Sequence, residues 1–144
     1  MQKRAASFKI TLLKGKMPIT SKVDKKMNLT TFTLTGELTM DEILGALKSF
    51  WEGRELTLNT LWDTRNAVVT NLKSSEMGNI AEFIGQYRNR FEERKNGKAA
   101  IAASTDLQYG LSRILGTFYE REDIPIKLQP FRTMEEAIQW LGQS

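Results

Sequence analysis

The chain of 144 residues contains no cysteine and no histidine. Without cysteine there is no disulfide, no thiolate nucleophile and no Cys-ligated metal centre. Without histidine the commonest general base is missing, together with the Ser-His-Asp and Cys-His arrangements and nearly every transition-metal site. The remaining chemistry depends on carboxylates, lysine, tyrosine or an oxygen-ligated Mg²⁺ or Ca²⁺. We therefore expect a protein that is not an enzyme and that carries no cofactor and no metal.

Long apolar runs are missing as well. No run approaches the ~18 apolar residues of a membrane span, and the apolar stretch at 10–13 is too short for the core of a signal peptide. We therefore expect no membrane span and a cytoplasmic location.

A net positive charge is missing outside the first 26 residues. The net charge is +4, yet residues 1–26 hold eight Lys/Arg and one acid, whereas the rest hold thirteen and sixteen. This basic segment has no aromatic residue except Phe8, which favours a solvated arm over a nucleic-acid surface. The break at Lys14-Gly15-Lys16 predicts a basic extension over 1–16, followed by a single globular domain over 17–144.

Hydrophobic periodicity and capping signals predict the order β-β-α-β-α-β-α-β-α. The predicted strands cover 19–24, 29–35, 56–63, 98–103 and 126–131, and the predicted helices cover 39–51, 74–94, 104–118 and 133–141. Strands that alternate with helices require crossovers, so the sequence predicts an α/β fold with a mixed, mostly parallel sheet covered by helices.

The stretch 56–63 is predicted to be the central strand. Leu58 and Trp62 fall on one face and Leu61 on the other, as in a strand buried on both sides. We expect this strand to end at Asp63, with ligands or partners bound at the carboxyl edge just beyond it. Asp63 and Thr64 are therefore candidate binding residues, either for Mg²⁺ or for a partner, with hydrogen bonding to the next loop as the simpler interpretation.

An ordered set of short motifs runs from about residue 19 to residue 141. It comprises Thr35-Gly36-Glu37-Leu38-Thr39, Leu61-Trp62-Asp63, Lys98-Ala99-Ala100-Ile101-Ala102, Tyr109-Gly110-Leu111-Ser112-Arg113, Phe131-Arg132-Thr133 and Glu136-Ala137-Ile138-Gln139-Trp140-Leu141. This set resembles the STAS-like, SpoIIAA-like family of small bacterial proteins. The resemblance implies a fold shared in outline with anti-sigma-factor antagonists and with the lipid-binding CRAL-TRIO domain. For most members it implies no settled molecular function.

Ser74 and Ser75 occupy the place where, in the better-understood antagonists, a serine of an Asp-Ser-Ser-Gly type motif is phosphorylated to switch binding of a kinase. Here the place reads Lys73-Ser74-Ser75-Glu76, so the two serines match and their neighbours do not. The resemblance therefore marks Ser74 and Ser75 as candidate phosphorylation sites. The alternative is that one of them is the N-cap of the helix that follows.

Tyr109, Gly110 and Arg113 are further candidate binding residues, in the first turns of the third helix. Glycine costs about 1 kcal/mol relative to alanine in a helix interior. Gly110 is thus expected to serve close packing, a ligand or a partner. Arg113 is expected to bind an anion or to pair with Glu120 or Glu76.

Three functions remain open from the sequence. The first is a non-catalytic regulatory module that acts through protein contact, as a dimer or with another protein. The second is a binder of a small apolar or lipid-like ligand in a crevice between helices and sheet, where Trp51, Tyr119 and Trp140 end apolar stripes. The third is an enzyme that uses Asp63 or Asp106 with Mg²⁺. If the two carboxylates lie at the same edge of the sheet and share a site, the pKa of one of them would be raised.

Overall fold

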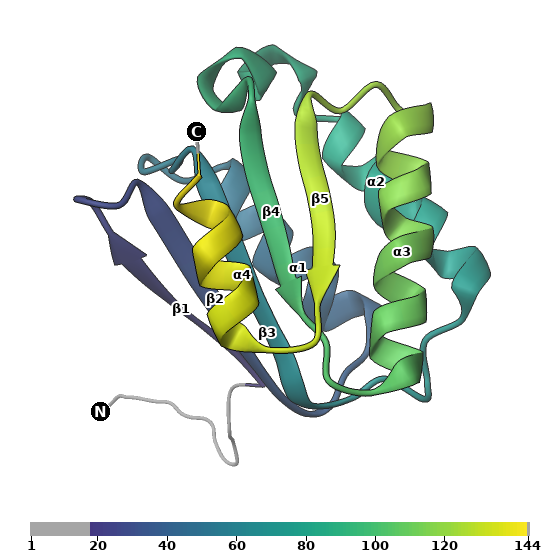
Figure 1. The fold of residues 1–144 in the computed structure, drawn as a ribbon. Helices are drawn as coiled ribbons and strands as arrows, with labels where there is room; N and C mark the ends of the chain where they lie inside the picture. The colour runs from purple at the N-terminus through teal and green to yellow at the C-terminus, as the bar shows by residue number, and fades with distance from the viewer. Residues whose placement is uncertain (1–17, 144) are drawn as a thin grey trace, which may run out of the picture.

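The computed structural model describes residues 18–143 as a five-stranded sheet with helices on both faces (Figure 1). The strands lie in the order β1-β2-β3-β4-β5, with β1 antiparallel to β2 and all other neighbours parallel. Their bounds are β1 Ile19–Asp24, β2 Leu29–Glu37, β3 Asn59–Val68, β4 Gly97–Ala102 and β5 Ile126–Phe131. The predicted α/β fold with a mixed, mostly parallel sheet is confirmed, and β3 is its central strand. The predicted extension over 1–16 lies outside the described residues.

Three helices cover one face of the sheet and a fourth covers the other (Figure 1). The first three are α1 Met40–Trp51, α2 Met77–Gly85 and α3 Asp106–Arg121, and the fourth is α4 Met134–Leu141. Each of the first three connects two parallel strands, and right-handed crossovers place such helices on the same face when the strands add in sequence. No helix within residues 18–143 is both long and apolar enough to cross a membrane.

Threonine is the N-cap residue of three of these helices. Thr39 and Thr105 form reciprocal capping boxes with the residue three positions on, Glu42 and Gln108. Thr133 accepts a hydrogen bond from the amide of Glu136 at 3.2 Å, but the Glu136 carboxylate binds the threonine hydroxyl instead of its amide. The capping box at Thr133 is therefore only half formed.

The prediction of one long helix over 74–94 is wrong. A short 3₁₀ turn, Ser74–Glu76, leads into α2, which ends at Gly85, and a second 3₁₀ segment, η2, covers Arg88–Arg94. The break lets the Arg90 guanidinium reach the carbonyl oxygens of Trp51 and Gly53, each at 2.7 Å. It also turns Arg94 into the core. Non-local hydrogen bonds thus outweigh the continuity of the helical pattern.

The predicted end of the central strand at Asp63 is also wrong. β3 continues to Val68, because its pairing with β2 resumes after an irregularity in which β3 holds one residue more than β2. The polar residues after Asp63 therefore belong to the strand and not to a loop. Pairing with β2, which the composition of 64–68 does not reveal, decides this boundary.

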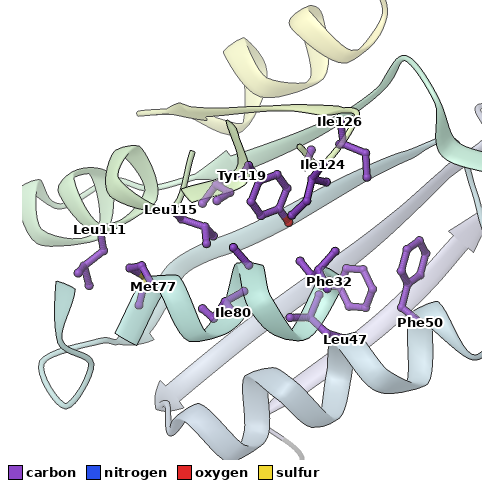
Figure 2. Close-up of a cluster of buried hydrophobic side chains, with 14 of the residues drawn as sticks. Phe32, Leu47, Phe50, Met77, Ile80, Leu111, Leu115, Tyr119, Ile124 and Ile126 are labelled. Carbon is purple, nitrogen blue, oxygen red and sulfur yellow. The ribbon is translucent and has the colours of Figure 1, made fainter. Parts of the chain in front are cut away.

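The core consists of two clusters on opposite faces of the sheet. The larger lies between the sheet and α1–α3 (Figure 2). Trp62 packs against it and stacks on Phe32, with ring centroids 3.9 Å apart. The smaller lies under α4 and contains Leu61 and Leu141. Leu61 and Trp62 thus point to opposite faces, as expected. Ile138 is 45% exposed, because α4 meets the sheet through Ala137 and Leu141.

Candidate functional site

A cavity of about 90 Å³ lies between the sheet and helices α1–α3; we call it the crevice. Its apolar lining comes from strands (Leu34, Trp62, Ile101 and Leu128), from α1 and α2 (Ile43, Leu47, Met77 and Ile80), from α3 (Leu111, Leu115 and Tyr119), and from the connections that hold Leu38, Val69 and Leu72. Ile43, Thr64 and Leu72 are half-buried, whereas Ile80 and Tyr119 are buried. The crevice therefore opens near the carboxyl edge of the sheet and is deepest toward the end of α3.

Three polar side chains in the lining are already bonded within the protein. The Thr64 hydroxyl donates to the carbonyl of Ala102 at 2.8 Å, and the Ser112 hydroxyl donates to the carbonyl of Gln108 at 2.8 Å. The Gln108 amide nitrogen donates to the carbonyls of Thr64 at 2.8 Å and Ala67 at 3.0 Å. These bonds tie the first turn of α3 to β3 and use up the donors of all three side chains.

Tyr119 is the exception among the polar groups of the lining. Its side chain is 8% exposed, and no group of the described residues forms a hydrogen bond with its hydroxyl. Figure 2 shows the ring leaving α3 with its oxygen directed toward the middle of the apolar cluster. Burial raises the pKa of Tyr119 to about 12, against an opposing effect of the Arg94 charge, so the hydroxyl is protonated at neutral pH.

Arg94 is a buried cation that sequence reasoning missed, because it stands in a run of polar residues that resembles a solvated helix end. Its exposed fraction is 3%, and no carboxylate of the described residues lies within 4.0 Å of it. Its Nε donates to the carbonyls of Thr57 at 3.0 Å and Leu58 at 3.3 Å. The guanidinium carbon lies 5.0 Å from the ring centroid of Phe50 and 5.2 Å from that of Trp51. Burial lowers its pKa to about 10, so the charge persists at neutral pH.

Asp63 and Thr64, expected to form one binding site, point to opposite faces of the sheet. Thr64 lines the crevice, whereas Asp63 shares the face of Leu61. The buried Asp63 carboxylate accepts two hydrogen bonds from the Arg65 side chain, from Nε at 2.8 Å and from Nη2 at 3.0 Å. These bonds hold the pKa of Asp63 below its ordinary value, despite its burial. The carboxylate is thus ionised and already occupied by a side chain of the same strand.

Asp106 and Asp63 each have an arginine partner of their own. The exposed Asp106 carboxylate binds Arg132 at 2.9 Å, and Asp63 has its own arginine and a lowered pKa. In the part of the chain from 18 to 143, no three acidic side chains gather where they could hold a metal ion.

Tyr109, Gly110 and Arg113 lie on α3 but do not line the crevice. The guanidinium of Arg132 covers the ring of Tyr109, 4.3 Å from its centroid. A Cβ atom at Gly110 would meet nothing within 4 Å, so the close-packing interpretation of this glycine is wrong. Arg113 is exposed, and among the described residues it forms no ion pair with Glu120 or Glu76.

Ser74 and Ser75 are exposed in the 3₁₀ turn before α2. The expectation that one of them caps a helix is wrong, because the capping position before α2 is Glu76, and neither serine forms a side-chain cap bond. The Glu76 carboxylate instead accepts a hydrogen bond from the amide of Lys73 at 2.8 Å. Phosphorylation at Ser74 or Ser75 stays a prediction.

A second, wider groove lies between β1 and α1. Its volume is about 690 Å³, and it contains none of the residues that the sequence marks as candidate sites. Small residues of α1, among them Gly45 and Ser49, line it together with Thr20 of β1. Of the residues expected to end apolar stripes at a crevice, Tyr119 lines the crevice, whereas Trp51 is buried outside its lining. Because both are buried, neither forms a self-association face.

No family model matches the sequence, and no curated protein matches it significantly. Among solved structures, the chain is similar to an uncharacterized protein of the DUF3478 family from Shewanella loihica PV-4, whose crystal structure is described as having a SpoIIAA-like fold. The two chains are 18% identical, the match covers 85% of this chain and 91% of the other, and the TM-score is 0.48. The fold named for that protein is the one that the sequence motifs imply. A similarity of this size carries no argument about function.

Proposed function

We propose that this protein is a non-catalytic module that binds a small apolar molecule in the crevice. The observation that carries this proposal is the cavity of about 90 Å³ under helices α1–α3, with a lining that is almost entirely apolar. Well-packed protein cores leave few voids larger than a water molecule. Pockets for small ligands are typically concave and apolar, with a few placed polar groups, as the crevice is.

The volume of the crevice limits the ligand. An engineered cavity of about 150 Å³ holds benzene, which corresponds to about 25 Å³ for each carbon atom. At that ratio, about 90 Å³ accommodates roughly four heavy atoms. Because the lining is half-buried at Ile43 and Leu72, one or two more atoms can extend toward the opening. The ligand is therefore a molecule of about four to six heavy atoms, or the end of a longer one.

The non-catalytic part of the proposal rests on the residue types and on the state of the acids. The chain has no histidine and no cysteine. Asp63 is held ionised by Arg65, whereas a general acid or base works best with a pKa near the working pH. The crevice itself contains no carboxylate and no amine in its lining.

Ser112 provides a matched pair of variants for a test. Its side chain lines the crevice, and within residues 18–143 the Ser112 hydroxyl forms one hydrogen bond, to the carbonyl of Gln108 in the same helix. Ser112→Leu fills the crevice, and Ser112→Ala leaves it open. We expect the hydrocarbon 2-methyl-1-butene to shift the methyl NMR signals of Leu111 and Leu115 in the wild type and in Ser112→Ala, but not in Ser112→Leu. No shift in the wild type, or equal shifts in all three proteins, would contradict the proposal.

A second candidate function is self-association through the carboxyl edge of the sheet. Val68 at the end of β3 and Leu107 at the start of α3 are 42% and 45% exposed, and the bond from Gln108 to the carbonyl of Ala67 brings their neighbours together. Exposed apolar side chains that share an edge favour a contact surface. If this edge joins two copies, Val68→Asp weakens the association and lowers the average sedimentation coefficient of the sample. Ile138→Asp, on the opposite face, leaves that average unchanged. A wild type that sediments as a monomer at every concentration would contradict this candidate.

A further inference from the structure

The hydroxyl of Tyr119 is a buried hydrogen-bonding group without a partner in the described part of the chain. Burying a polar group without a hydrogen bond destabilises a protein, so nearly all such groups in native structures are satisfied. A phenylalanine at this position would bury the same ring without that cost. The hydroxyl therefore requires an explanation beyond the packing of the core.

The crevice supplies that explanation, because Tyr119 is part of its lining. The hydroxyls of Thr64 and Ser112 donate to carbonyls of the chain, and the Gln108 amide donates to two more. Tyr119 thus carries the one side-chain donor of the lining that the described residues leave unused. A ligand in the crevice meets this O–H group and otherwise apolar surface.

The charge of Arg94 sets the polarity that the ligand must have. Arg94 is buried, it has no carboxylate partner among the described residues, and its charge acts on the hydroxyl of Tyr119. A nearby cation makes the surroundings of this hydroxyl electropositive, and in a low-dielectric interior such an effect is only weakly screened. An electronegative oxygen is therefore favoured there over a second donor such as an amine.

We propose that Tyr119 is the polar recognition group of the crevice and that the ligand is a short apolar molecule ending in an acceptor oxygen, either a ketone or a carboxylate. This inference rests on the proposed function and adds the chemical class of the ligand. Tyr119 Oη donates a hydrogen bond to the ligand oxygen, and the short carbon chain lies along Leu115 and Ile80 toward the opening. No bond is made or broken, since the step is one of binding.

Three probes of nearly equal shape test the inference. They are 2-butanone, propionate and 2-methyl-1-butene, of which the last has a methylene group in place of the ketone oxygen. We expect both oxygen-containing probes to bind about 3- to 10-fold more weakly to Tyr119→Phe than to the wild type, because one hydrogen bond is lost. The dissociation constant of 2-methyl-1-butene should stay unchanged or decrease. Titration of the Ile80 and Leu115 methyl signals measures all six constants.

The outcomes separate this inference from the proposed function. If 2-methyl-1-butene binds but the oxygen-containing probes bind both proteins equally, the crevice is a ligand site and the role of Tyr119 is wrong. If no probe binds the wild type, both proposals are wrong. A loss for 2-butanone alone identifies a ketone, and a loss for propionate alone identifies a carboxylate; either result supports the inference.

The stability of the ligand-free protein gives an independent readout. A tyrosine whose hydroxyl lacks a partner should be replaceable by phenylalanine with an unchanged or raised Tm. If the hydroxyl were instead hydrogen-bonded inside the core, the change to phenylalanine should lower the Tm by several degrees. A clear fall in the Tm of ligand-free Tyr119→Phe would overturn the inference, whatever the probes do.

Discussion

The ion pair between Asp63 and Arg65 permits a quantitative test of whether Asp63 is structural. Asp63 is buried, whereas the Arg65 side chain is 40% exposed. Removing one partner or the other should therefore destabilise the fold by different amounts. Among the described residues, Arg65→Met leaves the buried carboxylate with one donor, the backbone amide of position 65 at 3.2 Å. Loss of charge-assisted hydrogen bonds to a buried group costs about 2–3 kcal/mol. Asp63→Asn leaves an arginine that water can solvate, and should cost about 1 kcal/mol.

Urea denaturation at pH 7 measures the free energy of unfolding of both variants and of the double variant. We expect Arg65→Met to be the less stable single variant. The double variant Asp63→Asn/Arg65→Met should recover about 1 kcal/mol relative to Arg65→Met, since no buried charge is left without a partner. Equal losses in the two single variants, or additive losses in the double variant, would refute the role of Arg65 as the partner of a buried carboxylate.

The same pair predicts a pH dependence. The folded-state pKa of Asp63 lies below its unfolded value of about 3.9. The stabilisation is therefore complete above about pH 4 and is lost as the pH falls through the folded-state pKa. The difference in stability between wild type and Asp63→Asn should be constant from about pH 8 to pH 5 and should shrink below about pH 4. A difference that grows on acidification would contradict the direction of the shift.

Two further predictions concern the deep end of the core and the glycines. Arg94→Ala should reduce the free energy of unfolding, measured by urea denaturation, by about 3 kcal/mol. Two backbone carbonyls lose their donor, and two aromatic rings lose contact with the guanidinium. The control Lys95→Ala, at an exposed neighbour, should reduce it by less than about 0.5 kcal/mol. Gly110→Ala should stabilise the folded protein by about 0.5–1 kcal/mol, since the added Cβ meets nothing within 4 Å. Gly97→Ala should destabilise it by about 1–3 kcal/mol, since the added Cβ would clash with the carbonyl of Leu58. Equal effects of the two glycine changes on the Tm would show that the local packing is not as described.

Local sequence patterns predict the elements of this fold well, because alternation and capping act between near neighbours. The opposite faces of Leu61 and Trp62 and the threonine caps at Thr39 and Thr105 are of this kind. The end of β3 is not, because it depends on pairing with β2 past an extra residue near Thr64. The break after α2 likewise depends on bonds to α1 that no periodicity contains.

The candidate site was harder to predict than the fold. Tyr109, Gly110 and Arg113 were expected to bind because glycine is unfavourable inside a helix, yet all three lie outside the crevice. Gln108 could have been found, because it stands three residues after the N-cap Thr105, where a capping box places a glutamine. The sequence marks Tyr119 as the end of an apolar stripe beside a crevice, and it does line the crevice. That its hydroxyl is unused among the described residues could not be predicted, because this depends on neighbours distant in sequence.

The central claim is that helices α1–α3 and the sheet enclose a crevice that accepts a small apolar guest. A crystal structure of the wild-type protein under xenon pressure tests it most directly, because xenon enters apolar cavities of this kind. The account predicts a xenon atom beside Leu111, Leu115 and Ile80, and its disappearance in Ser112→Leu. A tightly packed lining with no xenon between the helices and the sheet would contradict it.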